Sequence, residues 1–312
     1  MKKQAAGLHK VALAALFTVG NALLRYPWRQ GDTNVLFLFL LSVVGALLPA
    51  FLLYPVFRRI WRRPIGKSKL RLFGVAALSV LFAAYAVYCA WRSCADYVTF
   101  SVELVLPRGN RFLLTALFLG CAVGLSRLSD KAMDSFSLLA FVGVVICAVF
   151  LFVVGIPHFQ SSHLGTDLLV WDAAVLESVP SLWKESLLPL TVLSLYFALT
   201  VPRGGERALA LGTGIGCVIL FLCVLQAILT FGTAYTAQLT YPYSYATRIL
   251  SVGQYFFRLE GFSYLLDYAA CLLRCAISLA VAKRLLGRFS PHAAKGLPLC
   301  VGVVLLACSI FL

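Results

Sequence analysis

Polar residues recur at helical spacing within a long apolar segment near the end of the chain. Their successive spacings of 4, 3, 4, 3 and 4 residues place them on one face of a helix. Charged side chains within a membrane span nearly always face the bundle interior or a water-filled cavity. We therefore expect an inward polar face that can meet the charged groups of a small ligand. Its residues are Glu260, Tyr264, Asp267, Cys271, Arg274 and Ser278.

Asp267 and Arg274 are the charges of this face that lie deepest in the segment. They lie about 10 Å apart along the helix axis, which argues against a direct salt bridge. A charge within a span costs about 2.5–3.5 kcal/mol on insertion scales, so each needs another partner. Water, an opened helix end or the ligand's own charges could serve. We expect Asp267 to line the outer access path and Arg274 to hold its helix against the inner half of the bundle.

A second apolar segment carries a similar row of polar side chains. Tyr85, Tyr88, Arg92 and Asp96 are spaced by 3, 4 and 4 residues and share one helix face. Tyr85 lies near the middle of its segment, whereas the two charges approach one end. Arg92 and Asp96 also fit a simple ion pair at the membrane interface, so only the tyrosines are assigned to a ligand site.

The composition indicates that membrane-spanning helices position these residues. Of 312 residues, 61% are hydrophobic and 12% are charged, and several apolar runs approach or exceed the about 20 residues that cross a bilayer. The runs are continuous rather than alternating, which argues against a β-barrel. We predict an all-α polytopic membrane protein with one transmembrane domain over residues 1–312. The expected spans are 11–28, 34–57, 72–98, 112–126, 132–156, 187–201, 208–231, 262–282 and 297–312.

The distribution of basic residues predicts the orientation in the membrane. With the N-terminus cytoplasmic, 18 of the 27 Lys and Arg residues fall on the inner side. The net charge of +15 is then a topology signal rather than a sign of nucleic-acid binding, and nucleic acid is not an expected partner. The segment "RRIWRRPIGKSKLR" is interpreted as a cytoplasmic loop that touches anionic lipid.

Two of the expected spans are interrupted. The first is broken by Gly20 and Asn21 and then by Arg25 and Pro27, and the sixth is short and carries Pro189. The sixth span comes five spans after the first, and this odd offset makes it run opposite to the first. Interrupted spans at corresponding positions of two inverted halves are typical of a transporter-type binding site near the bilayer midplane. In the alternative interpretation, Gly20 and Pro189 only kink ordinary helices.

The interrupted spans predict a five-plus-five inverted repeat that lacks its tenth span. Repeat one covers about 11–156, repeat two about 187–312, and an outer loop covers 157–186, with a short surface helix expected within it. A ligand site is expected where spans one, three, six and eight meet. The residues assigned to it are Thr18, Gly20, Asn21, Tyr85, Tyr88, Ser194, Tyr196, Tyr264 and Asp267.

Motifs for catalysis, metals or cofactors are lacking in the sequence. The ten cysteines form no CxxC pair and lie mostly in apolar runs, so we expect neither a structural disulfide nor a metal site. The segment "GTGIG" from Gly212 to Gly216 lies in an apolar run with no preceding strand, which favours close helix packing over a nucleotide loop. We expect no enzyme activity and no cofactor.

One segment of the chain resembles a known family. The segment "YPYSYATRILSVGQYFFRLEGF" is similar to the Pro-Tyr-rich segment of the spore germination permeases, the B subunits of nutrient germinant receptors. These proteins belong to the amino acid–polyamine–organocation transporter superfamily. The similarity falls on Tyr241, Pro242, Arg248, Arg258 and Glu260.

Three further segments extend the resemblance across the chain. "LLRCAISL" resembles the family's following basic residue at Arg274, and "VGNALLRYP" resembles its opened first span at Gly20 and Pro27. "LWKESLLPL" resembles its acidic residue before the sixth span, at Glu185. The resemblance assigns structural or coupling roles to Pro27, Glu185, Pro242, Arg258, Glu260 and Arg274.

The resemblance implies a membrane subunit of a germinant receptor. Its expected ligand is an amino acid or similar nutrient, its expected partners are A-type and C-type receptor subunits, and its expected location is the lipid bilayer of the cell or the spore inner membrane. The alternative is an ion-coupled amino-acid transporter. The chain departs from the family in having nine expected spans rather than ten, and an acid at Asp267 where an aromatic residue is usual.

Overall fold

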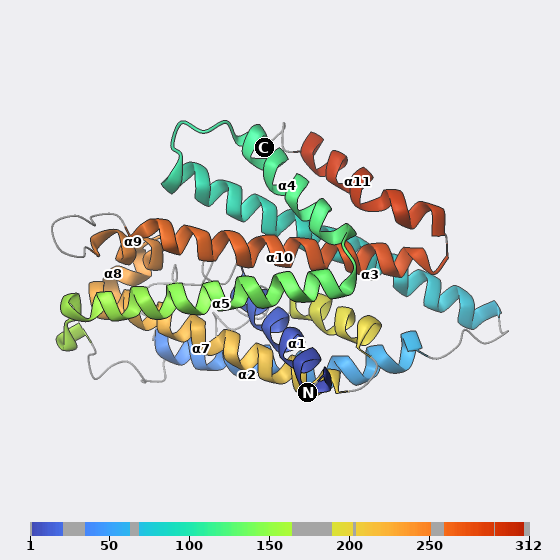
Figure 1. Cartoon of the computed structure of the whole chain (residues 1–312), viewed down its shortest axis with the longest axis horizontal. Helices are drawn as coiled ribbons and strands as arrows, with labels where there is room; N and C mark the ends of the chain where they lie inside the picture. The colour runs from blue at the N-terminus through green and yellow to red at the C-terminus, as the bar shows by residue number, and fades with distance from the viewer. Residues whose placement is uncertain are drawn as a thin grey trace.

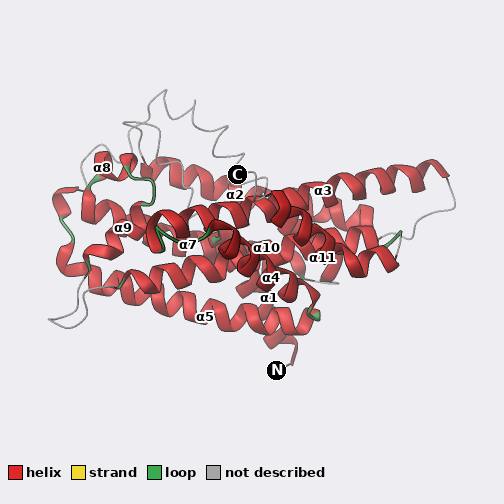
Figure 2. Cartoon of the chain, turned by 90° about the horizontal axis from the view of Figure 1, so that it is seen from above, coloured by secondary structure: helices red, strands yellow, loops and turns green. Residues whose placement is uncertain are grey.

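The computed structural model describes residues 2–20, 35–62, 69–163, 189–201, 204–250, 259–289 and 291–308. These ranges are almost entirely helical and contain no strand (Figure 2). Together with the apolar character of the helices, this confirms the predicted all-α polytopic membrane architecture. The inverted-repeat relation between the two halves stays a prediction.

Most described helices follow the expected spans closely, whereas α1 (Lys2–Val19) begins and ends before the expected span 11–28, whose residues 21–28 lie outside the described ranges. Each expected span overlaps a described helix, and the short α8 and α9 lie between α7 and α10 in the chain. The bounds are α1 (Lys2–Val19), α2 (Val35–Arg62), α3 (Lys69–Phe100), α4 (Arg111–Arg127), α5 (Asp130–Gly155), an unlabelled helix (Pro189–Thr200), α7 (Gly205–Phe231), α8 (Thr233–Gln238), α9 (Pro242–Ile249), α10 (Glu260–Gly287) and α11 (Pro291–Cys308).

Local sequence sets several of these helix ends. The Asn110 side chain accepts a hydrogen bond from the Phe112 backbone N–H at 2.9 Å and caps α4. Ser129 caps α5 in the same way. Gly232 separates α7 from α8 with φ of 80°, a conformation that glycine adopts without steric penalty. Pro189 is the first described residue of the helix Pro189–Thr200, so the predicted interruption at this proline stays a prediction.

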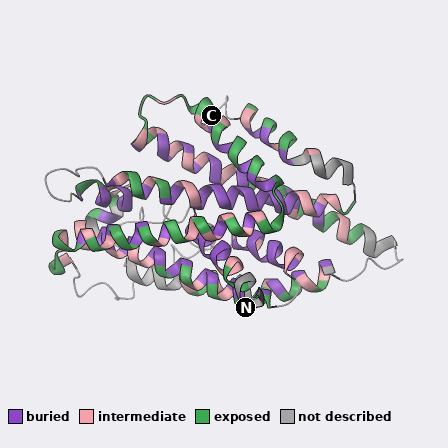
Figure 3. Ribbon diagram, in the orientation of Figure 1, coloured by how far each residue is buried: buried purple, intermediate pink, exposed green. Residues whose placement is uncertain are grey.

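Long apolar helices and an exposed apolar stripe identify the membrane-facing surface. Four stretches in the described ranges are long and apolar enough to cross a membrane: Phe73–Val105, Asp130–His158, Gly205–Phe231 and Glu260–Gly287. On α5 the exposed side chains repeat every three or four residues (Figure 3), which is the pattern of a helix with one face toward lipid. They are Leu139, Val142, Ile146, Val149 and Val153.

Helix α10 lies in the centre of the molecule. It runs between α3 and α5 in Figure 1 and also packs against α1, α4, α9 and α11. Every residue from Ala270 to Ala282 is buried. The polar face predicted for this helix therefore points into protein, and its buried members must find partners inside the bundle.

Helices α1 and α7 form another closely packed pair. A Cβ atom at Gly212 would lie 2.5 Å from the Ala14 Cβ, and one at Gly216 would lie 2.7 Å from the Ala15 carbonyl oxygen. The "GTGIG" segment thus lets two helix backbones approach each other, as expected for small residues at a membrane helix interface.

Candidate ligand-binding site

The end of α1 is held against the middle of α10. Gly20 closes the last turn of α1 with a backbone hydrogen bond to Leu16, and its own carbonyl oxygen accepts a hydrogen bond from the Arg274 Nη1. A Cβ atom at Gly20 would lie 2.7 Å from the Ala270 carbonyl oxygen, so only glycine fits this contact. The end of α1 at Gly20 therefore places a backbone carbonyl next to a buried guanidinium.

Arg274 is a buried cation, and the Gly20 carbonyl and the Phe17 ring stabilise its charge. Its residue is 7% exposed, and the guanidinium carbon lies 5.4 Å from the centroid of the Phe17 ring. The C-terminal end of a helix carries free carbonyls and a partial negative charge, so the end of α1 suits a cation. The Arg274 Nε has no hydrogen-bond partner within the described ranges, which leaves it free to donate.

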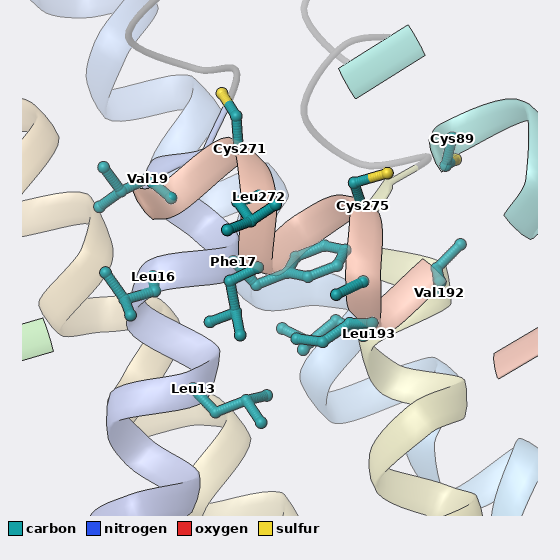
Figure 4. Close-up of a cluster of buried hydrophobic side chains, with 14 of the residues drawn as sticks. Leu13, Leu16, Phe17, Val19, Cys89, Val192, Leu193, Cys271, Leu272 and Cys275 are labelled. Carbon is teal, nitrogen blue, oxygen red and sulfur yellow. The ribbon is translucent and has the colours of Figure 1, made fainter. Parts of the chain in front are cut away.

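Two more helices complete a junction around Arg274. The Tyr85 hydroxyl on α3 lies beside Thr191 of the helix Pro189–Thr200, within the electrostatic reach of Arg274. Figure 4 shows a cluster of buried apolar side chains to which the same four helices contribute, among them Phe17, Cys89 and Leu193. The four elements are those of spans one, three, six and eight. The junction thus combines guanidinium, phenol and hydroxyl groups that can bind a carboxylate.

Thr18 and Ser194 are both buried, and the Thr18 hydroxyl bonds within α1. The Thr18 hydroxyl donates back to the Ala14 carbonyl at 2.9 Å, and its Cβ lies against Gly216 of α7. Ser194 is buried in the core. Thr18 serves helix packing instead, since a hydroxyl in a span readily bonds to its own preceding turn.

Tyr196 lies in an ionic cluster at one end of the bundle. Lys10 bonds to Asp134 at 2.7 Å, and Arg284 pairs with Asp130. Both cations lie over the Tyr196 ring, 5.5 and 5.1 Å from its centroid. The first turn of α5 and the last turn of α10 meet here, so acids at a helix start face bases at a helix end. Tyr196 and Gly20 therefore belong to different parts of the bundle.

Tyr264 and Asp267 lie on α10 toward α9. The Tyr264 ring packs edge-on against Phe100, which also contacts Tyr241. Asp267 is only 2% exposed, and neither carboxylate oxygen has a hydrogen-bond partner in the described part of the chain. This carboxylate is thus distinct from the junction around Arg274.

Two residues with predicted structural roles start the helices at this end. Pro242 occupies the first turn of α9, where its missing N–H removes no helical hydrogen bond. Glu260 occupies the first turn of α10, where an acid is favoured by the helix dipole. Both positions therefore suit the local helix starts.

Tyr88 lines a separate polar pocket of about 360 Å³ beside α3 and α4. Arg92 donates to the Tyr88 hydroxyl at 3.4 Å and pairs with Asp96 at 3.9 Å. Arg111 and Trp91 also line the pocket. The side chains predicted for one site thus fall into the junction, the ionic cluster, the Asp267 region and this pocket.

Part of the prediction falls outside the described residues. This holds for Asn21, Pro27, Glu185 and Arg258, and for the surface helix expected in the outer loop. These assignments stay predictions.

The structure adds residues that local patterns did not reveal. Phe17 and Thr191 belong to the junction although neither stands out in the sequence. Arg248 donates to the Leu104 carbonyl at 2.9 Å, in a π-helical turn (Ser101–Val105) that extends α3. The resemblance of the Pro-Tyr-rich segment singles out Arg248, whereas nothing in the sequence indicates that the Leu104 carbonyl is its partner.

Comparison with known proteins agrees with this architecture. A family described as spore germination protein matches residues 36–311, which include most of the helices and both buried charges of α10. A search among curated proteins finds no match. The matched region also contains the Pro-Tyr-rich segment and the arginine that holds the end of α1. The chain therefore belongs to the spore germination protein family.

Proposed function

We propose that this germination-related membrane protein is the membrane subunit of a nutrient germinant receptor. In this proposal it binds a small amino-acid-like germinant, and its role is binding and signalling without catalysis or a cofactor. The observation that carries the proposal is the hydrogen bond from Arg274 to Gly20, in a junction of four helices. Family membership supports the link to germination.

The junction offers a route from ligand binding to a change of structure. A guanidinium has five N–H donors in a planar fork that matches a carboxylate. A germinant carboxylate at Arg274 competes with the Gly20 carbonyl, because charge-assisted bonds are stronger than bonds to a neutral acceptor. Binding then loosens the end of α1 from α10. In this proposal the Tyr85 hydroxyl, which lies within electrostatic reach of Arg274, also donates to the carboxylate.

The proposed setting is a receptor complex in the spore inner membrane. The N-terminus faces the cytoplasm, and the partners are A-type and C-type receptor subunits, as the family resemblance implies. Movement of α1 or α10 would reach those partners through the membrane-facing helices. The ion-coupled transporter differs in that the ligand crosses the membrane during each cycle.

Ligand binding by the purified protein tests the proposal. The protein in lipid nanodiscs is screened against the twenty amino acids by thermal shift, and affinities are measured for each amino acid that raises the unfolding temperature. Arg274→Gln should weaken binding at least about tenfold, the loss expected when a buried charged bond of about 1.4 kcal/mol or more is removed. Arg288→Gln on the exposed end of α10 is the matched control.

Germination assays then separate a sensor from a transporter. Spores that carry Arg274→Gln should lose the response to the amino acid identified in the screen, while Arg288→Gln spores respond normally. A receptor subunit shows no accumulation of labelled amino acid in vesicles. Equal affinity of the Arg274→Gln and parent proteins would overturn the proposed site, and sustained uptake would favour the transporter.

A further inference from the structure

The carboxyl group of Asp267 is buried without a hydrogen-bond partner. Its residue is 2% exposed, and both oxygens lack a partner among the residues that the structure describes. Its neighbours on α10, Leu266 and Ala270, are also buried. An isolated ionised carboxylate in such surroundings is strongly disfavoured and tends to be neutralised. The carboxylate therefore requires a cation that neutralises its charge.

Neutral titratable groups lie around Asp267. Thiols and phenols in electrostatic contact with it come from α3, α7, α9 and α10 itself. They are Tyr97, Cys223, Tyr243 and Tyr264. Further out, α5 contributes Cys147 beside Tyr243, and α4 contributes Cys121 beside Tyr268. These groups supply no positive charge.

The nearest described arginines are engaged elsewhere. Arg274 lies about 10 Å away along the helix axis and bonds to the Gly20 carbonyl. Arg248 on α9 bonds to the Leu104 carbonyl. Neither makes an ion pair with Asp267.

Tyr243 provides a second unpartnered polar group in the same region. This residue of α9 is 2% exposed, and its hydroxyl has no hydrogen-bond partner within the described ranges although it lies beside the Cys223 thiol. Two polar groups from different helices thus lie close together without a bond. A proton on the carboxyl would make it a donor as well as an acceptor, which a hydroxyl can match.

We propose that Asp267 is a proton-binding site, with its carboxyl protonated while α9 is packed against α10. A proton fits because it needs no additional volume among closely packed side chains. When water reaches the site, the carboxyl O–H bond breaks, the proton passes to water, and the resulting carboxylate is hydrated. The site adds a proton as ligand to the proposed function, yet it does not depend on which germinant binds.

Infrared spectroscopy of the full chain in lipid nanodiscs tests this site directly. A protonated carboxyl group has a carbonyl stretch that is separate from the carboxylate bands. The parent protein should show this band at neutral pH, and Asp267→Asn should lose it. Asp130→Asn is the matched control, because the Asp130 side chain is 47% exposed and ion-paired, and it should retain the band. No germinant is required, so failure here is distinguishable from failure of the proposed function.

A second variant covers the case in which Asp267→Asn does not fold. Tyr243→Phe keeps the ring and removes the hydroxyl, so it should shift the frequency of the Asp267 band without removing it. The proposal is overturned if the parent protein has only carboxylate bands, or if the protonated band is unchanged in folded Asp267→Asn. An unchanged frequency in Tyr243→Phe would overturn the contact with α9.

Discussion

Arg274 of α10 donates a hydrogen bond to the carbonyl oxygen of Gly20, which lies 254 residues earlier in the chain at the end of α1. One bond thus joins the first helix to the central helix and satisfies two groups that would otherwise be buried alone. A guanidinium and a helix C-terminus attract each other through charge and dipole. The contact explains how a cation resides in the middle of a buried helix.

Replacement of Arg274 by Leu should destabilise the protein. The Gly20 carbonyl would lose its partner in a buried place, which costs about 1–3 kcal/mol. Membrane abundance and unfolding temperature should fall, whereas Arg274→Lys should recover part of the loss because it keeps a charged donor. Abundance and germination response are measured together. If the Leu variant matches the parent in both, the contact has no structural role.

Gly20→Ala should destabilise the packing of α1 on α10. The added Cβ would approach the Ala270 carbonyl oxygen to 2.7 Å, so the helices must separate, at about 1–3 kcal/mol for overpacking. Gly124→Ala on α4 is the control, because no atom lies within 4 Å of its Cβ position. Thermal unfolding in detergent should show a lower unfolding temperature for Gly20→Ala than for Gly124→Ala. Equal stability of the two variants would contradict the close contact between Gly20 and Ala270.

Lys10 and Asp134 should be energetically coupled. Their side chains are only partly exposed, and the Nζ–Oδ1 distance is 2.7 Å. Residues in one ionic network show coupling of about 0.5–3 kcal/mol in double-mutant cycles. The cycle uses Lys10→Gln, Asp134→Asn and the double variant, with unfolding followed by denaturant. Additive effects would show that the ion pair adds nothing to stability.

The orientation can be tested by cysteine labelling in intact cells. In a background without native cysteines, Ser162→Cys should react with an impermeant reagent, because Ser162 is exposed and belongs to the predicted outer loop. Lys67→Cys in the basic loop should react only after permeabilisation. The reverse pattern would place the N-terminus outside.

Much of the fold could be predicted because the signals are local. Apolar runs define the helices, and 3,4 spacing places Asp267, Cys271 and Arg274 on one buried face of α10. The break at Gly20 also has a local cause. Each of these features depends on neighbours within a few turns of the same helix.

The partners across helices could not be predicted. Nothing near Arg274 in sequence indicates the Gly20 carbonyl, and nothing near Arg248 indicates Leu104. Tyr196 illustrates the same limit, because the approach of Lys10 and Arg284 to its ring depends on how α1, α10 and the helix Pro189–Thr200 pack together. Backbone carbonyls have no sequence signature, so contacts to them become visible only after the helices are packed.

Helix α10 carries ionisable residues at three depths along its length. Asp267, Arg274 and Arg284 span about 25 Å of one continuous helix. A packed helix moves as a unit, so a displacement at one depth is felt at the other two. Thermodynamic linkage then requires reciprocity: if a proton at Asp267 changes the affinity for a ligand at Arg274, the ligand changes proton affinity by the same factor. In this way α10 would couple the effect of pH on the protein to the effect of nutrient concentration.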